Sequence, residues 1–395
     1  MVTDFPFLLQ SMAWPLALLI AWFLGERLHE IWQVPRVSSY VAVGLLGSLI
    51  NLPGLTDAVP GLPFLANVAL SLVLFELGYR INLRWFRHNP WVMALGLVES
   101  ALTFAAVYLA SGWFDMGTDT RLIFASLSIS ASPAGIVRVA NDLRSAGQVT
   151  ERVLHLCAIN CLVSVLAFNL VVGYWHLSTS GDLVLAAFGS VHVLVTSVAV
   201  GALLGVAAPW LLRAQRVQAR DVTVVFALAV VLLTTMAYGL KLSPLLAALT
   251  FGIVARERRV HLTNAQRGFG TAGDLLTVFL FVYIASLLNW ADVGTGMLFG
   301  LVLIVVRTAT KVGCSVAAAR LSGSTERKGL LTGLALTPMS AFAILLLEQS
   351  RLYGFEPAAH VLSSMAGMML VLELFGPVVT QRALLAAHET HVTKE

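Results

Sequence analysis

The sequence predicts an all-α polytopic membrane protein that forms one transmembrane unit over residues 1–395. Of the 395 residues, 58% are apolar and only 12% are charged, whereas soluble domains carry about 25% charged residues. The apolar residues gather in runs long enough to cross a bilayer, with no linker or nucleotide-binding motif between them. We therefore expect a membrane protein and not an enzyme.

Thirteen candidate spans follow one another, because a span needs about 20 mostly apolar residues, and fewer where a helix is broken. The first run lacks a basic leader and a small-residue cleavage site, so we expect a retained helix. The predicted spans are 7–24, 35–50, 63–79, 90–111, 121–140, 153–175, 185–212, 222–240, 243–255, 268–288, 294–319, 329–350 and 358–381.

Lys and Arg residues are distributed unequally between the loops that alternate along these spans. One set of loops holds 20 of them, and the other holds only Arg121, Lys241 and Arg351. The positive-inside rule then predicts an external N-terminus and a cytoplasmic C-terminus. As the location we expect the inner membrane of a bacterium. The basic residues form no runs, so we expect membrane lipids and no nucleic acid as partners.

The fifth and twelfth spans are interrupted near their middle by Pro133 and Pro338, each flanked by Ser or Thr. Proline removes a helical hydrogen bond, and such a break is tolerated in lipid only where it is buried or lines a cavity. Paired interrupted helices, one early and one late, indicate a transporter site between two repeats. The alternative is two kinks that serve packing.

Two cations, Arg307 and Lys311, lie inside the predicted span 294–319. Because they are four residues apart, they share one face of the helix. Charges at membrane depth are costly and indicate function. The structural alternative is that both bind carbonyl groups freed by the two helix breaks.

Intramembrane carboxylates form a second group of candidates. Glu99 lies in the middle of its span and Glu76 at the end of another, with Asp274 and Glu373 nearer helix ends. An acid at membrane depth is a functional candidate. The alternatives are a pair between Glu99 and a helix cation, a pair between Glu76 and Arg80, and a helix cap by Asp274.

The three cysteines all lie in apolar segments, so no disulfide framework is expected. Cys157 and Cys161 share a helix face near His155, which would suit a soft metal. Since His155 lies on another face, we interpret the three residues as packing. We therefore expect neither a metal nor a cofactor.

Six short motifs follow one another along the chain. They are VPRVSSYVAVGLLG at 34–47, LFELGYRINL at 74–83, SASPA at 130–134, SPLLAALTFG at 243–252, LTPMSAFA at 336–343 and ELFGP at 373–377. In this order they resemble motifs of the monovalent cation:proton antiporter superfamily, nearest its NhaP-like and KefB/NapA-like branches. The resemblance covers nearly the whole chain.

The resemblance implies an NhaA/NapA-like antiporter fold, with 13 transmembrane helices in inverted repeats and two crossed, broken helices. It also implies a homodimer that works by elevator-type movement. Core helices would lie around 63–175 and 268–350, and the remaining helices would form the dimerisation scaffold. The implied activity is secondary exchange of Na⁺ or K⁺ for protons.

The chain departs from the superfamily where an acidic residue is expected in the sixth helix. The matching pair is Asn160–Cys161, and Leu156 and Ser132 occupy two further positions that carry acids in NhaP-like members. A cation leaving water needs several oxygen ligands, usually with a carboxylate among them. A thiol that stays protonated offers little to Na⁺ or K⁺.

Two functions therefore remain open. In the first, Asn160, Cys161, Ser132 and Thr337 line a cation site, and other residues supply the titrating carboxylate and its charge partner. These are Glu76, Glu99, Lys311 and Arg307. In the second, the protein is antiporter-like without cation/proton exchange: an anion or neutral-solute carrier, a uniporter or a sensor. Arg307 and Lys311 would then attract an anion, aided by half-helix N-termini.

Overall fold

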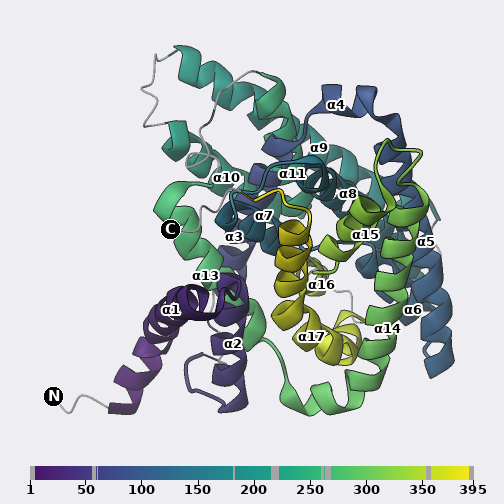
Figure 1. The fold of residues 1–395 in the computed structure, drawn as a ribbon. Helices are drawn as coiled ribbons and strands as arrows, with labels where there is room; N and C mark the ends of the chain where they lie inside the picture. Colours follow the sequence, from purple (N-terminus) through teal and green to yellow (C-terminus); the bar gives the residue numbers. More distant parts are fainter. Residues whose placement is uncertain are drawn as a thin grey trace.

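The computed structural model describes residues 5–55, 59, 61–180, 183–214, 222–258, 262, 268–352 and 357–390, and their regular structure is helical (Figure 1). The helices are α1 (Phe5–Trp32), α2 (Arg36–Leu49), α3 (Leu62–Arg80), α4 (Leu83–His88), α5 (Pro90–Ser111), η1 (Gly112–Phe114), α6 (Thr118–Ser128), α7 (Pro133–Asp142), α8 (Gln148–Ser180), α9 (Leu183–Ala214), α10 (Val222–Gly239), α11 (Pro244–Glu257), α13 (Gly270–Ser286), α14 (Trp290–Ala317), α15 (Glu326–Ala335), α16 (Ser340–Leu352) and α17 (Pro357–Ala386).

Each predicted span coincides with one helix or with one interrupted pair, so the all-α fold class is confirmed. Within the described residues, eight helices are long and apolar enough to cross a membrane, and α2 and α13 are shorter apolar helices. The number of thirteen crossings stays a prediction. Five of the basic residues used to predict the orientation lie outside the described residues: Arg216, Arg220, Arg259, Arg267 and Lys394.

The helices pack into two bundles (Figure 1). In one, α14 packs against α5, α15 and α17, and α8 packs against α5 and α6. In the other, α11 packs against α3, α9 and α10, while α13 packs against α1, α2 and α3. The half-helices α7 and α16 contact both bundles, so they lie between them.

Glycines allow close approach inside each bundle. A Cβ atom on Gly78 or Gly252 would overlap backbone atoms of the facing helix, so α3 and α11 meet backbone to backbone. Gly300 and Gly367 do the same between α14 and α17. Small residues of this kind favour tight helix pairing in membranes, because they remove the side chains that would keep backbones apart.

A succession of unbroken helix, broken pair and unbroken helix occurs twice, as α5, α6/α7, α8 and as α14, α15/α16, α17. The first break spans residues 129–132 and the second spans 336–339. The backbone N–H of Ser132 donates to the carbonyl oxygen of Pro338 at 2.6 Å, so the breaks meet. Pro133 begins α7 at a position where its missing N–H costs nothing.

Candidate functional site

Arg307 lies fully buried where the two helix breaks meet. Its guanidinium donates to the carbonyl oxygens of Ser128, the last residue of α6, and Ser130, in the first break, at 2.9 and 2.6 Å. It also donates to those of Leu336 and Thr337 in the second, at 3.2 and 2.6 Å. A helix break leaves such carbonyls without helical partners, and Arg has enough donors to serve both ends. These contacts confirm, for Arg307, the structural alternative that the cations bind carbonyls freed by the breaks.

Lys311 lies one turn farther along α14 and forms a fully buried ion pair with Glu99 of α5. Lys311 Nζ also donates to the carbonyl oxygen of Ile129 in the first break, at 3.0 Å. Glu99 Oε1 accepts a further hydrogen bond from Thr103 at 3.4 Å. The other oxygen, Glu99 Oε2, is buried and has no hydrogen-bond partner within the described residues. The pair therefore keeps one acceptor oxygen unused at membrane depth.

Helix α8 brings Asn160 and Cys161 to the place where the two helix breaks meet, which we call the crossing. Ser100, the neighbour of Glu99 on α5, donates its hydroxyl to Asn160 Oδ1 at 3.2 Å. The amide nitrogen of Asn160 is buried and makes no hydrogen bond within the described part of the chain. Cys161 Sγ donates to the carbonyl oxygen of Ala131, in the first break, at 3.4 Å. The α8 residues thus connect the carboxylate on α5 with the break between α6 and α7.

Ser132 and Thr337 use their side chains on the local backbone. Ser132 Oγ caps α7 by accepting from the backbone N–H of Gly135 at 3.3 Å. Thr337 Oγ1 donates to the carbonyl oxygen of Leu334, on the last turn of α15, at 2.6 Å. The predicted site residues that these contacts connect around the crossing are Ser132, Asn160, Cys161, Thr337, Arg307, Lys311 and Glu99.

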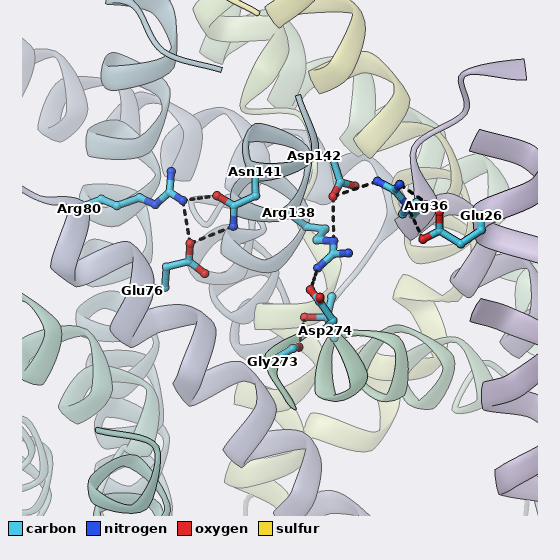
Figure 2. A network of polar contacts seen from close by, with 10 residues as sticks. Glu26, Arg36, Glu76, Arg80, Arg138, Asn141, Asp142, Gly273 and Asp274 are labelled. Atoms are coloured by element: carbon cyan, nitrogen blue, oxygen red, sulfur yellow. Dashed lines mark hydrogen bonds and ion pairs between the residues drawn. The ribbon is translucent and has the colours of Figure 1, made fainter. Parts of the chain in front are cut away.

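Glu76 lies in a different cluster, at the end of α3 (Figure 2). Glu76 Oε1 lies 2.7 Å from Arg80 Nη2 and accepts from Asn141 Nδ2 of α7 at 2.9 Å. Arg80 also donates to Asn141. The predicted pair between Glu76 and Arg80 is therefore confirmed, and these contacts place Glu76 at the α3–α7 boundary and not among the crossing residues.

Asp274 does not cap α13, so that prediction is wrong. The helix begins at Gly270, and its N-cap residue is Phe269, in the left-handed conformation with φ 58°. The helix thus starts four residues before Asp274, so the Asp274 side chain is too far along the helix to cap it and can contact a neighbouring helix. It pairs instead with Arg138 of α7 (Figure 2).

A chain of ion pairs, which sequence reasoning missed, extends from this contact (Figure 2). Arg138 lies 3.2 Å from Asp142, one turn along α7. Asp142 in turn lies 3.4 Å from Arg36 at the start of α2, which binds Glu26 of α1 at 2.8 Å. The four-residue spacing of Arg138 and Asp142 was the available signal. The chain ties α7 to three helices of the other bundle.

His155 packs apart from the two thiols. Its Nδ1 lies 2.7 Å from the carbonyl oxygen of Glu151, and its Nε2 accepts from the backbone N–H of Asn82 at 3.3 Å. The ring centroid lies 4.4 Å from that of Trp85 and 4.9 Å from that of Phe86. Both ring nitrogens are engaged, as the packing interpretation predicts.

The comparisons with known proteins agree with this architecture. The family model "Sodium/hydrogen exchanger, transmembrane" matches residues 16–386. A structure of the sodium proton antiporter MjNhaP1 from Methanocaldococcus jannaschii at pH 8 is similar with a TM-score of 0.64 and 13% identity, covering 97% of this chain and 96% of that one. An electron-microscopy structure of MjNhaP1 gives a TM-score of 0.67 and 14% identity, over 95% and 94% of the two chains. No curated protein sequence matches the chain.

Proposed function

Because the chain belongs to the sodium/hydrogen exchanger family, we propose that it is a secondary transporter that exchanges Na⁺ or K⁺ for protons. The observation that carries this proposal is the buried pair between Glu99 and Lys311 beside the helix breaks. Exchange requires that binding of the transported cation competes with binding of a proton. The Glu99 carboxylate can pair either with the transported cation or with the protonated amine of Lys311, so the two compete at this site.

The chemistry of one exchange follows from this pair. A cation that reaches Glu99 binds the unused Oε2, with the oxygens of Ser100, Thr103 and Asn160 as neighbouring ligands. Lys311 then loses its carboxylate, and because an unpaired ammonium is costly in a buried site, it releases its proton. The pair is neutral before and after the exchange. This site by itself thus moves one proton for each monovalent cation.

The carboxylate comes from α5 in this proposal, although the superfamily resemblance places it on α8. Cys161 faces the first break and donates its thiol proton to a carbonyl oxygen, so it supplies no charge there. Asn160 is hydrogen-bonded to the neighbour of Glu99. The two helices therefore meet where the acid is expected, which supports Glu99 as its replacement.

The second candidate is an antiporter-like protein without cation/proton exchange: a uniporter, a sensor, or a carrier of an anion or neutral solute. The absence of an acid at Asn160–Cys161 favours it. However, Arg307 donates to four carbonyl oxygens and Lys311 to Glu99. Neither cation is left to attract an anion, so we prefer exchange.

We further propose that α5, α6, α7, α8 and α14 to α17 form the moving core and that the other bundle forms the scaffold of a homodimer. The expected core ranges 63–175 and 268–350 include α3 and α13, which we now assign to the scaffold, and omit α17, which we now assign to the core. The packing of the two bundles supports the new division. We also propose an external N-terminus and a cytoplasmic C-terminus in a bacterial inner membrane, surrounded by lipids that contact the exposed apolar side chains.

The deciding experiment uses proteoliposomes that contain a pH-sensitive dye. Gradients of Na⁺, K⁺, Li⁺ or chloride are applied, and lumenal pH is followed. Exchange predicts a pH change driven by at least one cation that is lost in Glu99→Gln. Glu76→Gln, which removes an acid away from the crossing, is the matched control and should retain flux. Absence of proton flux with every cation would contradict exchange and leave the second candidate.

A further inference from the structure

A pocket of about 300 Å³ lies at the end of the molecule where α3 and α11 end and α8 begins, beside α4 (Figure 1). We call it the arginine pocket because Arg80 and Arg256 both line it. Asn82, Trp85 and Glu151 are further lining residues, and none of the lining residues belongs to the crossing. The volume has room for about ten water molecules, so a ligand larger than a single ion fits.

Arg256 has hydrogen-bond donors to spare. Its Nη1 donates to the carbonyl oxygens of Tyr79 and Arg80 at 2.7 and 2.9 Å, which anchors the guanidinium against the end of α3. Within the part of the chain that the structure describes, its Nε and Nη2 make no hydrogen bond, and no acid pairs with it. A guanidinium offers five N–H donors and no acceptor. Arg256 therefore brings an uncompensated positive charge to the pocket.

Arg80 contributes a second guanidinium. Its Nη2 lies 2.7 Å from Glu76 Oε1 and donates to Asn141 (Figure 2), so its charge is shared with an acid. Its Nε is buried and has no hydrogen-bond partner among the described residues. A buried donor without a partner is costly, and an oxygen of a ligand would satisfy it. Arginines suit phosphate in particular, because each planar fork can bind two oxygens.

The remaining polar groups of the pocket favour an anion as well. The side-chain oxygen of Asn82 accepts from backbone N–H groups at the start of α4, which leaves the side-chain nitrogen as a donor. His155, next to the pocket, accepts from the backbone N–H of Asn82 through Nε2, so its ring adds no charge in this contact. Glu151 is the one acid in the lining, and its side chain is 53% exposed. Water therefore screens its charge more strongly than that of the half-buried Arg256.

Side chains, and not the start of α8, are left to hold a ligand. The Glu389 carboxylate already accepts from the backbone N–H groups of Val149 and Thr150, each at 2.8 Å. Trp85 is half-buried, and its ring packs against that of His155 with the centroids 4.4 Å apart. It gives the pocket an apolar wall beside the two guanidinium groups. This combination suits an anionic group that carries a carbon skeleton.

We propose that the arginine pocket binds a phosphate monoester as a regulatory ligand. Arg80, Arg256 and Asn82 hold the phosphate oxygens, and Trp85 contacts the carbon skeleton. The lining comes from α3 and α11 in the proposed scaffold and from α8 in the proposed core, so the ligand contacts both and stabilises the arrangement that the structure shows. Binding therefore slows exchange, a consequence that rests on the proposed function, whereas the binding site does not.

Thermal unfolding in detergent tests binding without measuring transport, because a ligand of the folded state raises the unfolding temperature. The probe is inorganic phosphate, titrated against chloride at constant ionic strength, with N-methylglucamine as the counter-ion of both. We expect the unfolding temperature of the wild type to rise and to saturate. Phosphate also stabilises proteins in general as an excluded anion, but that effect is common to all variants.

Variants should move the half-saturating phosphate concentration in opposite directions. Arg256→Gln should raise it at least about tenfold, because a hydrogen bond to a charged group is lost. Asn82→Asp should raise it as much, and because it keeps the oxygen that caps α4, it remains informative if Arg256→Gln folds poorly. Glu151→Gln removes a repelling charge and should lower it about threefold. Arg87→Gln, exposed on α4 and outside the lining, is the matched control and should leave it unchanged.

The phosphate group can come from a soluble molecule or from a lipid, and nanodiscs separate the two sources. The phosphate titration is repeated in phosphatidylcholine nanodiscs with and without phosphatidic acid, a lipid phosphate monoester. If phosphatidic acid raises the unfolding temperature and removes the response to phosphate, the ligand is a lipid headgroup. If the response stays, the ligand is soluble. Both results support the phosphate site.

A response to phosphate that does not saturate, or that Arg256→Gln and Asn82→Asp both leave unchanged, would overturn the site. In proteoliposomes, saturating phosphate should slow exchange at least about twofold in the wild type and not in Asn82→Asp. Saturable binding without slower exchange would overturn the regulatory role. Because binding is measured without proton flux, a failure of exchange and a failure of this site are distinguishable.

Discussion

The backbone N–H of Ser132 donates to the carbonyl oxygen of Pro338 at 2.6 Å, which joins the two helix breaks directly. Arg307 then connects both breaks through four carbonyl oxygens. The crossing is therefore held by backbone groups and the Arg307 guanidinium, which reaches both breaks. The neighbouring Lys311 pairs with Glu99 and reaches only the first break, at Ile129.

Glu99→Gln should destabilise the protein as well as stop exchange, because it leaves the Lys311 side chain without its carboxylate partner in a buried site. Removing one partner of a buried pair costs about 3–5 kcal/mol, whereas replacing both with neutral groups is close to neutral. Glu99→Gln/Lys311→Met should therefore unfold near the wild-type temperature and remain inactive. Thermal unfolding in detergent checks this, and a double variant less stable than Glu99→Gln would contradict it.

Arg307→Lys should destabilise the crossing although it keeps the charge. A lysine ammonium cannot reach carbonyls of both breaks with the planar geometry of a guanidinium. Each hydrogen bond to a charged group contributes about 1.5–3 kcal/mol, so losing two of four costs about 3–6 kcal/mol. Arg84→Lys, at an exposed position on α4, is the control and should change the unfolding temperature little. Equal stability of the two variants would refute this role.

Adding Cys161→Asp to the Glu99→Gln variant should restore exchange of the cation for protons. Cys161 contacts the carbonyl oxygen of Ala131, and Lys311 contacts that of Ile129 in the same break, so a carboxylate at position 161 lies within reach of the ammonium. Proton flux in proteoliposomes should return to at least about a tenth of the wild-type rate, since a repositioned carboxylate recovers most of the electrostatic interaction. Cys161→Ser is the neutral control and should not rescue the flux.

Asp142→Asn should weaken the contact between α7 and the other bundle, because Asp142 pairs with both Arg36 and Arg138. We expect faster hydrogen exchange in α7 and a loss of about 1–3 kcal/mol, between the values for exposed and buried pairs. The control is Glu30→Gln, because the pair between Glu30 and Arg27 is 62% and 60% exposed. If the rate of hydrogen exchange in α7 does not change, this contact does not restrain α7.

The helix breaks could be predicted because their signal is local. Pro133 and Pro338, with Ser and Thr around them, weaken a helix through their own local chemistry, and the freed carbonyls require a donor such as Arg307. The sequence predicts a pair between Glu99 and a helix cation as one alternative, and the structure confirms it. The sequence could not choose Lys311 over Arg307 as that cation, because the two partners lie 212 residues apart in the chain. Only the packing of α5 against α14 selects Glu99.

The α7 ion pairs and the start of α13 were missed for different physical reasons. Arg138 and Asp142 have the spacing of a solvated helix face, and nothing local reveals that α2 and α13 cover it. The position of Asp274 depends on Phe269 adopting a left-handed φ of 58°, which apolar periodicity does not signal. Each error lies at a boundary: one at the contact of α7 with neighbouring helices, and the other at the first turn of α13.

The glycine contacts inside each bundle have a mechanical consequence. Gly78 and Gly252 join α3 to α11, and Gly300 and Gly367 join α14 to α17, by backbone contact that leaves little room for relative sliding. Between the bundles, long charged side chains such as Arg36 and Arg138 contribute to the contacts, together with the packing of α8 against α9 and of α17 against α2. Such side chains can change rotamer and partner. We therefore expect the boundary between the bundles to deform more readily than either bundle.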